Sequence, residues 1–564
     1  MSMASKAKRL MYLAHRWTGI AGCLLMLLWF VSGIVMLYVG YPKLTPWERL
    51  AALPELNPQS CCAALDDAAD GAGAGRAGTG AFSAGLVLTS IAGKPAYVAQ
   101  EAGRPAVYDG ATRAPKKGPA SAEDALRAAR LFVQETSATG RQAGELVASR
   151  QTGDSGQDAP SVAMPWPAAQ TRAPVVYQGL VEEDTWTHSR GLDIHRPLHK
   201  VEVSALEPVT LYISSRTGQV MLDAPATQQR WNYVGAWLHW LYAFRSTSSD
   251  PVWSWTVIVL SLVGTLSALS GVLVGIWRWR FSHRYKSGSR SPYREAWMKW
   301  HHVAGLLFGG FVCTWIFSGL MSMNPVGVFS PERKPDLRAY AGSMDSPLGP
   351  LADPRRIITA LGEDGFRPVE LAWRRLDGQA YVLAHDRRAH SRIVKSREGG
   401  LVVARAWTAE EVEPAARRLF PAQAMQASLV AQHDIYYYQR HPEAMNGALV
   451  RGLPALRLDF DDPEHTSVYI DLNTGQVGMS LSRSQRVGRW LFYFLHSWDT
   501  PALLNAELLR DAALIVLSLG GIVVAAAGTV LGWRRLRRRG RIRSAVKPHH
   551  SALGKRGQPG SPVM

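Results

Sequence analysis

The chain has 564 residues, a formal net charge of +18 and a mean hydropathy of −0.07. Its length exceeds that of one ordinary domain, and its four cysteines are too few for a disulfide framework. The positive charge gathers at the ends of apolar runs, so membrane topology explains it and we expect no nucleic-acid partner.

Four uncharged apolar runs are each long enough to cross a bilayer as a helix, since about 18 residues suffice. The runs are Trp17–Val39, Val252–Trp277, Val303–Met323 and Ala512–Trp533. The first is longer than the apolar part of a signal peptide, and a bulky sequence follows it instead of a small-residue cleavage site. We therefore expect four spans, the first an uncleaved anchor, with most of the mass outside the bilayer.

Clusters of lysine and arginine set the expected orientation of these spans. They precede the first span, fill the short link between the second and third, and follow the fourth. By the positive-inside rule, both termini and the link are cytoplasmic and the two long segments between spans are exported.

The spans and their orientation divide the chain into eight predicted regions. These are a cytoplasmic segment with the first span (1–39), a first exported region (40–235), an interface helix with the second span (236–277), a cytoplasmic link (278–300), the third span (301–323), a second exported region (324–490), an interface helix with the fourth span (491–533) and a basic cytoplasmic tail (534–564).

The first exported region combines two expected loops with short α and β elements. Ala63–Gly85 is rich in Ala and Gly, and Gln151–Pro174 is rich in Pro, Gly and Ser, so neither can bury a core. Pro95–Tyr108 predicts a β-hairpin, and a capping pair predicts a helix over residues 121–132. We expect Cys61–Cys62 to be an ordinary loop pair, although adjacent cysteines could also bind a metal or switch redox state.

The second half of the chain repeats the first. Around spans one and three, matching residues lie 286 positions apart: His15, Gly19, Trp29, Ser32 and Gly33 recur as His301, Gly305, Trp315, Ser318 and Gly319. Around spans two and four the offset is 257, and it pairs His239 with His496, Gly271 with Gly528 and Gly275 with Gly532. The four-residue spacing of these glycines suits close packing of membrane helices.

An internal duplication in one orientation predicts the fold class. We expect an α+β membrane protein in which four transmembrane helices form two tandem pseudo-symmetric halves. Each half carries an exported α+β module, and a pseudo-twofold axis lies along the membrane normal. The second module also begins a capped helix, at Thr408 with Glu411 and running through Phe420, as the first does at Ser121.

Two pairs of equivalent histidines mark the ends of the spans. His15 and His301 lie at the cytoplasmic ends of spans one and three, and His239 and His496 lie just before spans two and four on the exported side. Pseudo-symmetry turns equivalent residues toward each other, and two facing neutral imidazoles are the usual axial pair of a b-type haem. The sequence therefore predicts two haems b, with their iron bound by these four histidines.

Residues near His15 and His301 support haem binding there, but they leave open which of two adjacent histidines is the ligand. Gly19 and Gly305 lie four residues past their histidines, on the same helix face, where a glycine leaves room for a flat macrocycle. His302 lies about 100° round the helix from His301 and could be the ligand instead. The alternative for any one histidine is a polar residue tolerated at a helix end, but two symmetric pairs favour a cofactor.

Several stretches resemble the PepSY-associated transmembrane family. They are Trp300–Gly305 with Ser318–Pro325, Tyr469–Asp471 with Thr474–Val477, and Arg489–Leu491 with Leu495–Ser497. That family includes inner-membrane ferric-siderophore reductases of Gram-negative bacteria. The resemblance implies a four-span core, exported PepSY modules and a place in the bacterial inner membrane. For the reductase members it also implies two haems, held by residues that match His15, His301, His239 and His496.

The resemblance and the histidine pairs together predict a haem-dependent oxidoreductase. A span of about 20 residues at ~1.5 Å each is ~30 Å long, far for one electron transfer, so two haems in series make physical sense. Electrons would enter at the cytoplasmic pair and leave at the exported pair for a ferric chelate or ferric siderophore. Some family members carry a fused flavin domain. Here only about 30 residues follow Trp533, so we expect the donor to be a separate cytoplasmic flavoprotein or a quinol.

The second exported region also holds a dense polar and aromatic cluster that could bind the acceptor: His433, Tyr436, Tyr437, Tyr438, Arg440 and His441. The alternative is a strand with an aromatic face and ordinary surface charges. Two other functions stay open. One is a membrane-anchored PepSY module that binds or inhibits a partner without redox activity, and the other is a quinol-linked respiratory electron carrier.

Overall fold

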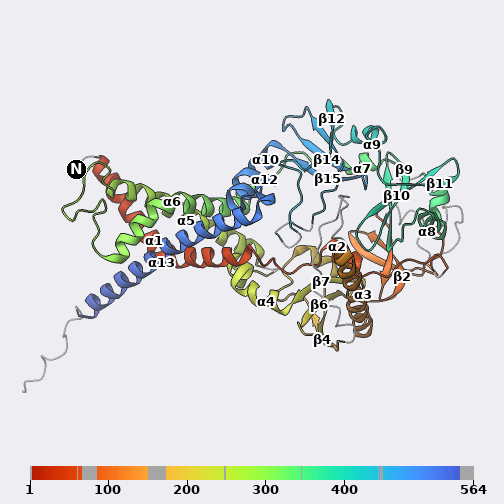
Figure 1. Cartoon of the computed structure of the whole chain (residues 1–564), viewed down its shortest axis with the longest axis horizontal. Coiled ribbons are helices and arrows are strands. Elements are labelled where there is room, and N and C mark those ends of the chain that lie inside the picture. Colours follow the sequence, from red (N-terminus) through yellow and green to blue (C-terminus); the bar gives the residue numbers. More distant parts are fainter. Residues whose placement is uncertain are drawn as a thin grey trace, which may run out of the picture. The chain divides into compact units, whose positions relative to one another are not determined.

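A computed structural model describes residues 3–59, 61–65, 85–149, 173–246, 249–343, 346–441, 444, 447 and 449–545. The chain divides into two compact units (Figure 1). The helical unit comprises Met1–Phe30, Val259–Phe317 and Val516–Met564, and the sheet unit comprises Val31–Ile258 and Ser318–Ile515. Most of the two expected loops and the end of the basic tail lie outside the described residues.

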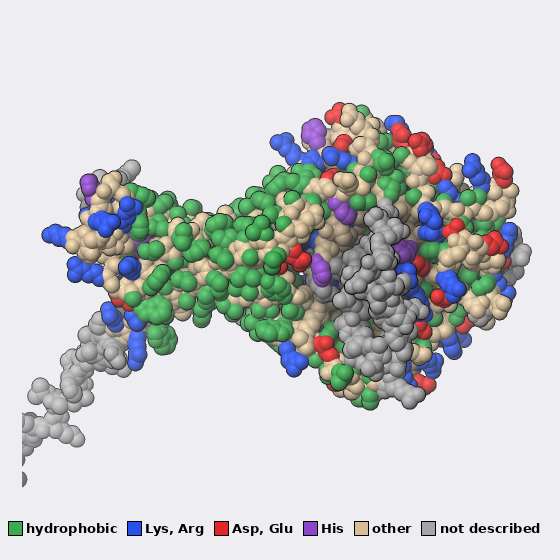
Figure 2. Space-filling view, viewed as in Figure 1, with side chains coloured by type: hydrophobic (Ala, Val, Ile, Leu, Met, Phe, Trp, Pro, Cys, Tyr) green, Lys and Arg blue, Asp and Glu red, His purple; other side chains and the backbone are tan. Residues whose placement is uncertain are grey.

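In the described part of the chain, four helices are long and apolar enough to span a membrane. They are α1 (Met3–Met36), α5 (Asp250–Arg278), α6 (Ala296–Ser322) and α13 (Glu507–Ala545). Hydrophobic side chains cover the visible face of these helices (Figure 2), as contact with lipid requires. The prediction of four spans is confirmed, and the chain is a multi-pass membrane protein.

Aromatic and small residues pack the core of the helical unit. Phe30 of α1 contacts Trp315 of α6, with 5.7 Å between ring centres. The Ile316 side chain packs on the backbone of Gly264 in α5. A Cβ added to Gly264 would lie 3.1 Å from Ile316 Cγ2. Membrane helices gain little from hydrophobicity when they associate, so close approach at small residues is what holds such a bundle together.

The described strands of the sheet unit form three antiparallel sheets. Two of them are four-stranded meanders, one from each half. The first contains β4 (Val175–Val181), β5 (Leu198–Val203), β6 (Val209–Ser214) and β7 (Val220–Pro225), and the second contains β12 (Met425–Val430), β13 (Ala455–Phe460), β14 (Ser467–Asp471) and β15 (Gln476–Leu481). Each has a register shift at an equivalent place, Tyr212/Ile213 in one and Tyr469/Ile470 in the other. The duplication therefore extends to backbone irregularities.

The third sheet takes strands from both halves, in the order β11-β10-β9-β8-β1-β2-β3. Its strands are β1 (Val87–Ile91), β2 (Lys94–Glu101), β3 (Arg104–Asp109), β8 (Glu370–Leu376), β9 (Gln379–His385), β10 (Ser391–Arg397) and β11 (Gly400–Ala404). Val87 pairs with Ala372 and Leu88 with Leu371. Each half thus has a four-stranded sheet of its own, as expected, and the two halves also share this third sheet. The pairing of β1 with β8 joins two edges that would otherwise expose unpaired backbone groups.

One long helix, α3, and several short ones complete the sheet unit. They are α2 (Pro46–Ala51), α3 (Ala122–Ser149), α4 (Ala226–Asn232), α7 (Leu337–Ala341), α8 (Pro354–Glu363), α9 (Ala409–Ala416), α10 (Arg483–Arg489), α11 (Leu495–Ser497) and α12 (Pro501–Asn505). The predicted caps of α3 and α9 and the predicted hairpin are confirmed. α3 continues well past Phe132, to Ser149, whereas α9 ends at Ala416, two residues after Pro414, which has no N–H to donate to a helical hydrogen bond.

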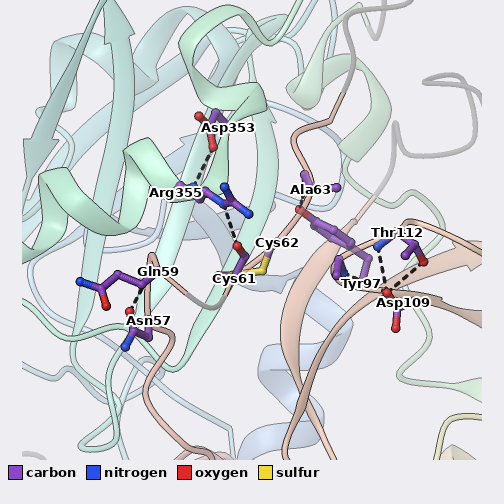
Figure 3. Close-up of a disulfide and its surroundings, with 11 residues drawn as sticks. Asn57, Gln59, Cys61, Cys62, Ala63, Tyr97, Asp109, Thr112, Asp353 and Arg355 are labelled. Atoms are coloured by element: carbon purple, nitrogen blue, oxygen red, sulfur yellow. Dashed lines mark hydrogen bonds between the residues drawn. A yellow bond between two sulfur atoms is a disulfide. The ribbon is translucent and has the colours of Figure 1, made fainter.

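Cys61 and Cys62 form a disulfide between adjacent residues (Figure 3). Each is only 2% exposed, in a core that contains residues of both halves. Arg355 Nε donates to the Cys61 carbonyl oxygen at 2.7 Å, and the Tyr97 hydroxyl donates to the Ala63 carbonyl oxygen at 2.8 Å. The expectation of an ordinary loop pair was therefore wrong, because the segment is bonded and buried where the two halves share a sheet.

Candidate haem sites

The structure brings His15 and His301 together in the helical unit. His15 lies on α1 and His301 lies near the start of α6. Their ring centres are 6.2 Å apart, and the two planes differ by 30°. These are two of the histidines that the sequence pairs through the 286-residue repeat.

Each of these imidazoles is oriented by a backbone carbonyl of a neighbouring helix. His15 Nδ1 lies 3.1 Å from the Ser267 carbonyl oxygen of α5, and His301 Nδ1 lies 3.0 Å from the Val524 carbonyl oxygen of α13. A carbonyl only accepts, so each Nδ1 carries the proton and each Nε2 keeps its lone pair. Neither Nε2 has a hydrogen-bond partner among the described residues. Histidines that bind metal are oriented in this way, with the other ring nitrogen donating to a carbonyl.

Two glycines of the repeat give the rings room to reach those carbonyls. An added Cβ on Gly271 would lie 2.6 Å from His15 Cε1, and one on Gly528 would lie 3.3 Å from His301 Cε1. The sequence predicted helix packing at these positions. That prediction is confirmed at Gly528, where an added Cβ would overlap Cys23 Sγ of α1, and at the second glycine of each pair, since Gly275 faces the Leu306 side chain and Gly532 faces Ile20.

The space predicted beside the other pair of glycines is present. An added Cβ on Gly305 would meet nothing within 4 Å in the described structure, and one on Gly19 would meet only Cys23 Sγ, at 3.9 Å. Both glycines lie one helical turn past their histidines. A flat ligand next to the imidazoles would meet no side chain from either position.

His302 is placed differently from His301. Its Nδ1 lies 2.7 Å from Ser291 Oγ and its Nε2 lies 3.0 Å from the Gly275 carbonyl oxygen. The ring is 7% exposed and lies edge-on to Trp279 and Tyr293. Both nitrogens are therefore engaged with the protein, and the residue ties the 278–300 link to the end of α5.

The second pair, His239 and His496, meets in the sheet unit. The ring centres are 6.1 Å apart and the planes differ by 72°. Nδ1 of His239 lies 3.0 Å from Ser32 Oγ, and Nδ1 of His496 lies 3.0 Å from Ser318 Oγ. The sequence analysis gave the two serines no role. Their recurrence next to glycine at a fixed offset was the signal that could have identified them.

A π-helical turn precedes each histidine of this pair. Tyr233–Trp237 leads to His239, and Trp490–Phe494 leads to His496. A left-handed residue then ends each segment, Leu241 in the first half and Trp498 in the second. Single π-helical turns are rare and are frequent at functional sites, because the wider turn redirects the side chains that follow.

A buried ionic network adjoins His496. Asp499 is fully buried, with its carboxylate oxygens 3.1 Å from Arg440 Nη2 and 3.5 Å from Arg489 Nη1. The Tyr438 hydroxyl donates to the same carboxylate, and Arg440 also donates to Ser497 Oγ at 3.1 Å. Two members of the predicted acceptor cluster therefore lie next to the His496 segment.

The remaining members of that cluster do not form one surface with these two. Tyr437 is fully buried and stacks on Tyr469, with 4.9 Å between ring centres. His433 Nε2 lies 3.0 Å from the Arg451 carbonyl oxygen, and His441 is exposed. These residues lie between β12 and β13, so the alternative of a strand with an aromatic face is wrong, and the side chains lie in different environments. Their role in binding an acceptor stays a prediction.

A family model for the PepSY-associated transmembrane region matches residues 12–347, which is more than half of the chain. The chain belongs to the PepSY-associated transmembrane family. The matched range includes both serines and three of the four paired histidines, while His496 follows it. No curated protein matches the chain.

The spacing of each histidine pair fits two axial ligands of a single haem iron. Two imidazoles that bind one metal ion from opposite sides, at about 2 Å each, place their ring centres roughly 6 Å apart. The observed separations are 6.2 and 6.1 Å. Among the described residues, no group of three or more His, Cys, Asp or Glu side chains could hold a bare metal ion. Two histidines would leave the remaining positions of a metal ion to other ligands, such as the nitrogens of a haem macrocycle.

Proposed function

We propose that this chain is a haem-dependent oxidoreductase of the bacterial inner membrane that binds two haems b. It would pass electrons across the membrane to a periplasmic ferric chelate or ferric siderophore. The observation that carries the proposal is the presence of two facing histidine pairs, each with Nδ1 held and with ring centres about 6 Å apart. Haem in these sites would supply one-electron iron chemistry, and the protein supplies its position and its surroundings.

The residues that would hold each haem follow from the hydrogen bonds. His15 and His301 would bind one iron, because carbonyls fix their Nδ1–H tautomers. His302 is excluded from that role in our proposal, because both of its nitrogens already have protein partners. His239 and His496 would bind the other iron, with Ser32 and Ser318 orienting the rings.

The direction of electron flow rests on charge and on the size of the modules. Lysine and arginine side chains gather at the end of the helical unit that carries the N-terminus of α1 and the α5–α6 link (Figure 2). The positive-inside rule places that end in the cytoplasm, together with the His15–His301 site. A separate flavoprotein or a quinol would donate electrons there. A bulky ferric complex would instead be reduced near His239 and His496, beside the large extramembrane sheets.

Reduction would also release the iron. Ferrous iron carries less charge than ferric iron and is a softer ion, so a chelate of hard oxygen donors binds it less well. Tyr438 and Arg440 contact Asp499 and Ser497, close to His496, so we expect the complex to dock beside these two side chains.

The proposal is tested by reoxidation of the reduced protein. Full-length protein in detergent is reduced with dithionite, freed of excess reductant and mixed with ferric chelates while the haem bands and a ferrous-specific dye are followed. We expect the bands to reoxidise and ferrous iron to appear together, and the His496→Ala variant to do both much more slowly. Reoxidation by a quinone and by no ferric chelate would favour the respiratory carrier, and protein without haem would favour a binding or inhibitory module.

A further inference from the structure

The two histidine pairs differ in the group that accepts the Nδ1 hydrogen bond. In the His15–His301 site both acceptors are backbone carbonyls, at 3.1 and 3.0 Å. In the His239–His496 site both Nδ1 partners are serine hydroxyls, at 3.0 Å each. With Nε2 bound to iron, the proton lies on Nδ1 and the hydroxyl accepts it. Ser32 and Ser318 are 1% and 0% exposed, so bulk water does not compete for these bonds. Within each site, the histidines of both halves have the same type of Nδ1 partner, so this type distinguishes one site from the other.

The acceptor at Nδ1 changes how strongly an imidazole donates electrons to iron. A carbonyl oxygen is a strong, fixed acceptor that pulls on the Nδ1 proton and makes Nε2 a better donor. A serine hydroxyl is a weaker acceptor, and inside a helix its own proton is free to bond to the carbonyl one turn earlier. Stronger donation stabilises ferric iron more than ferrous iron, and hydrogen bonding around the ligands is a recognised means of setting haem potentials.

We propose that the His239–His496 site has a higher reduction potential than the His15–His301 site because its positioning residues, Ser32 and Ser318, offer the rings weaker acceptors than the carbonyls of the other site. The inference rests on the proposed function, since it requires a haem at each site. One electron then moves downhill. Iron at the His15–His301 site goes from ferrous to ferric, iron at the His239–His496 site goes from ferric to ferrous, and each Nδ1 keeps its proton. Electron flow toward the exported side would therefore be built into the ligand hydrogen bonds.

The test is a potentiometric titration of the full-length protein, followed by its optical bands. We expect two one-electron steps, with the electron favouring the His239–His496 site by more than about tenfold, which corresponds to about 59 mV. The His496→Ala variant assigns the steps, because it should lose the higher one and keep the lower. Ser32→Ala and Ser318→Ala should each raise the higher midpoint further, since the loss of an acceptor weakens imidazole donation, and should leave the lower midpoint in place.

Two controls separate this effect from general damage. Ser318→Thr keeps a hydroxyl and should restore the wild-type midpoint. Ser261→Ala removes a buried serine of α5 that is not one of the four Nδ1 acceptors, and it should move neither midpoint. Equal midpoints, the reverse order, or unmoved midpoints in both alanine variants would overturn the inference while leaving the two haems in place. The complete absence of haem would instead overturn the proposed function itself.

Discussion

The two halves of the chain place different side chains near His239 and near His496. In the second half, Asp499 is fully buried between Arg440 and Arg489. In the first half, 257 positions earlier, Asn232 replaces Arg489 and Tyr242 replaces Asp499. Tyr242 packs against four rings, those of Tyr41, His188, Trp240 and Trp253, at centre distances of 5.0 to 5.8 Å. Equivalent backbone segments are thus stabilised by buried ion pairs in the second half and by aromatic packing in the first.

The ion pairs of Asp250, in the first half, are more exposed than those of Asp499, in the second. Asp250 binds Arg190 and Arg245 at 2.6 and 2.9 Å, but its side chain is 28% exposed, whereas that of Asp499 is 0% exposed. A buried charge depends on its partner because water cannot replace it, whereas a half-exposed charge keeps part of its hydration. The second half should therefore be the more sensitive to loss of a charged group.

The largest effect should come from Asp499→Ala. The change leaves Arg440 and Arg489 buried beside each other without a counter-charge, which typically costs about 3–5 kcal/mol. We expect a large fall in the thermal midpoint in detergent and selective loss of haem at the adjacent His496 site.

The matched control for this variant is Asp461→Ala, at an exposed position outside the network. It should leave both the midpoint and the haem content near the wild-type values. If Asp499→Ala were as mild as the control, the contrast between the two halves would be broken.

A buried ion pair that joins the two halves predicts a pH effect. Arg49 holds the buried Glu370 of β8 with bonds of 2.6 and 2.9 Å, and His385 Nδ1 lies 4.0 Å from the same carboxylate, with Arg374 also close by. Burial acts to raise the pKa of Glu370, but the Arg49 charge outweighs it and the pKa lies below the usual 4.5. Burial lowers the pKa of His385 below 6.5, against the opposing pull of Glu370.

Both shifts lead to loss of stability in acid. The unfolded chain binds the His385 proton more readily than the folded chain, so stability should fall as the pH drops below about 6.5. Protonation of Glu370 below about 4.5 then removes a charge-assisted pair worth about 1.5–3 kcal/mol. Thermal midpoints between pH 7.5 and 4 test this, and His385→Gln should flatten the upper part of the curve. If the curve of thermal midpoint against pH were the same in His385→Gln as in the wild type, His385 would not be the group that couples stability to pH.

The smallest effect should come from Tyr242→Phe in the first half. The change keeps the aromatic packing and removes the bond that Arg245 Nη1 donates to the Tyr242 hydroxyl at 2.7 Å. A single hydrogen bond of this kind is worth about 1 kcal/mol, so the midpoint should fall by only a few degrees and both haems should remain. A loss comparable to that of Asp499→Ala would mean that aromatic packing does not hold this half.

Repetition made much of this molecule predictable from its sequence. Constant offsets of 286 and 257 residues mark the two histidine pairs in the amino-acid sequence itself. The spans, the hairpin and the helix caps followed from local rules of length, turn chemistry and hydrogen bonding. These features depend on neighbours in sequence, or on symmetry that the sequence itself displays.

Features that depend on long-range contacts were not predictable in the same way. The pairing of β1 with β8 joins segments almost 300 residues apart, and no local pattern specifies that register. His302 could be told from His301 only through the fold of the link, which places Ser291 against it. The π-helical turns that precede His239 and His496 likewise have no sequence signal, because tertiary packing decides where an extra residue enters a helix.

The most direct test of the central claim is the haem content and reduced-minus-oxidised spectrum of three purified proteins: wild type, His301→Ala and His302→Ala. The last two differ by one position on the same helix, so they are matched in depth and size. We predict two haems b per chain in the wild type and in His302→Ala, and one in His301→Ala. A wild-type protein without haem bands, or a His301→Ala variant that keeps both haems, would contradict ligation by the facing pairs.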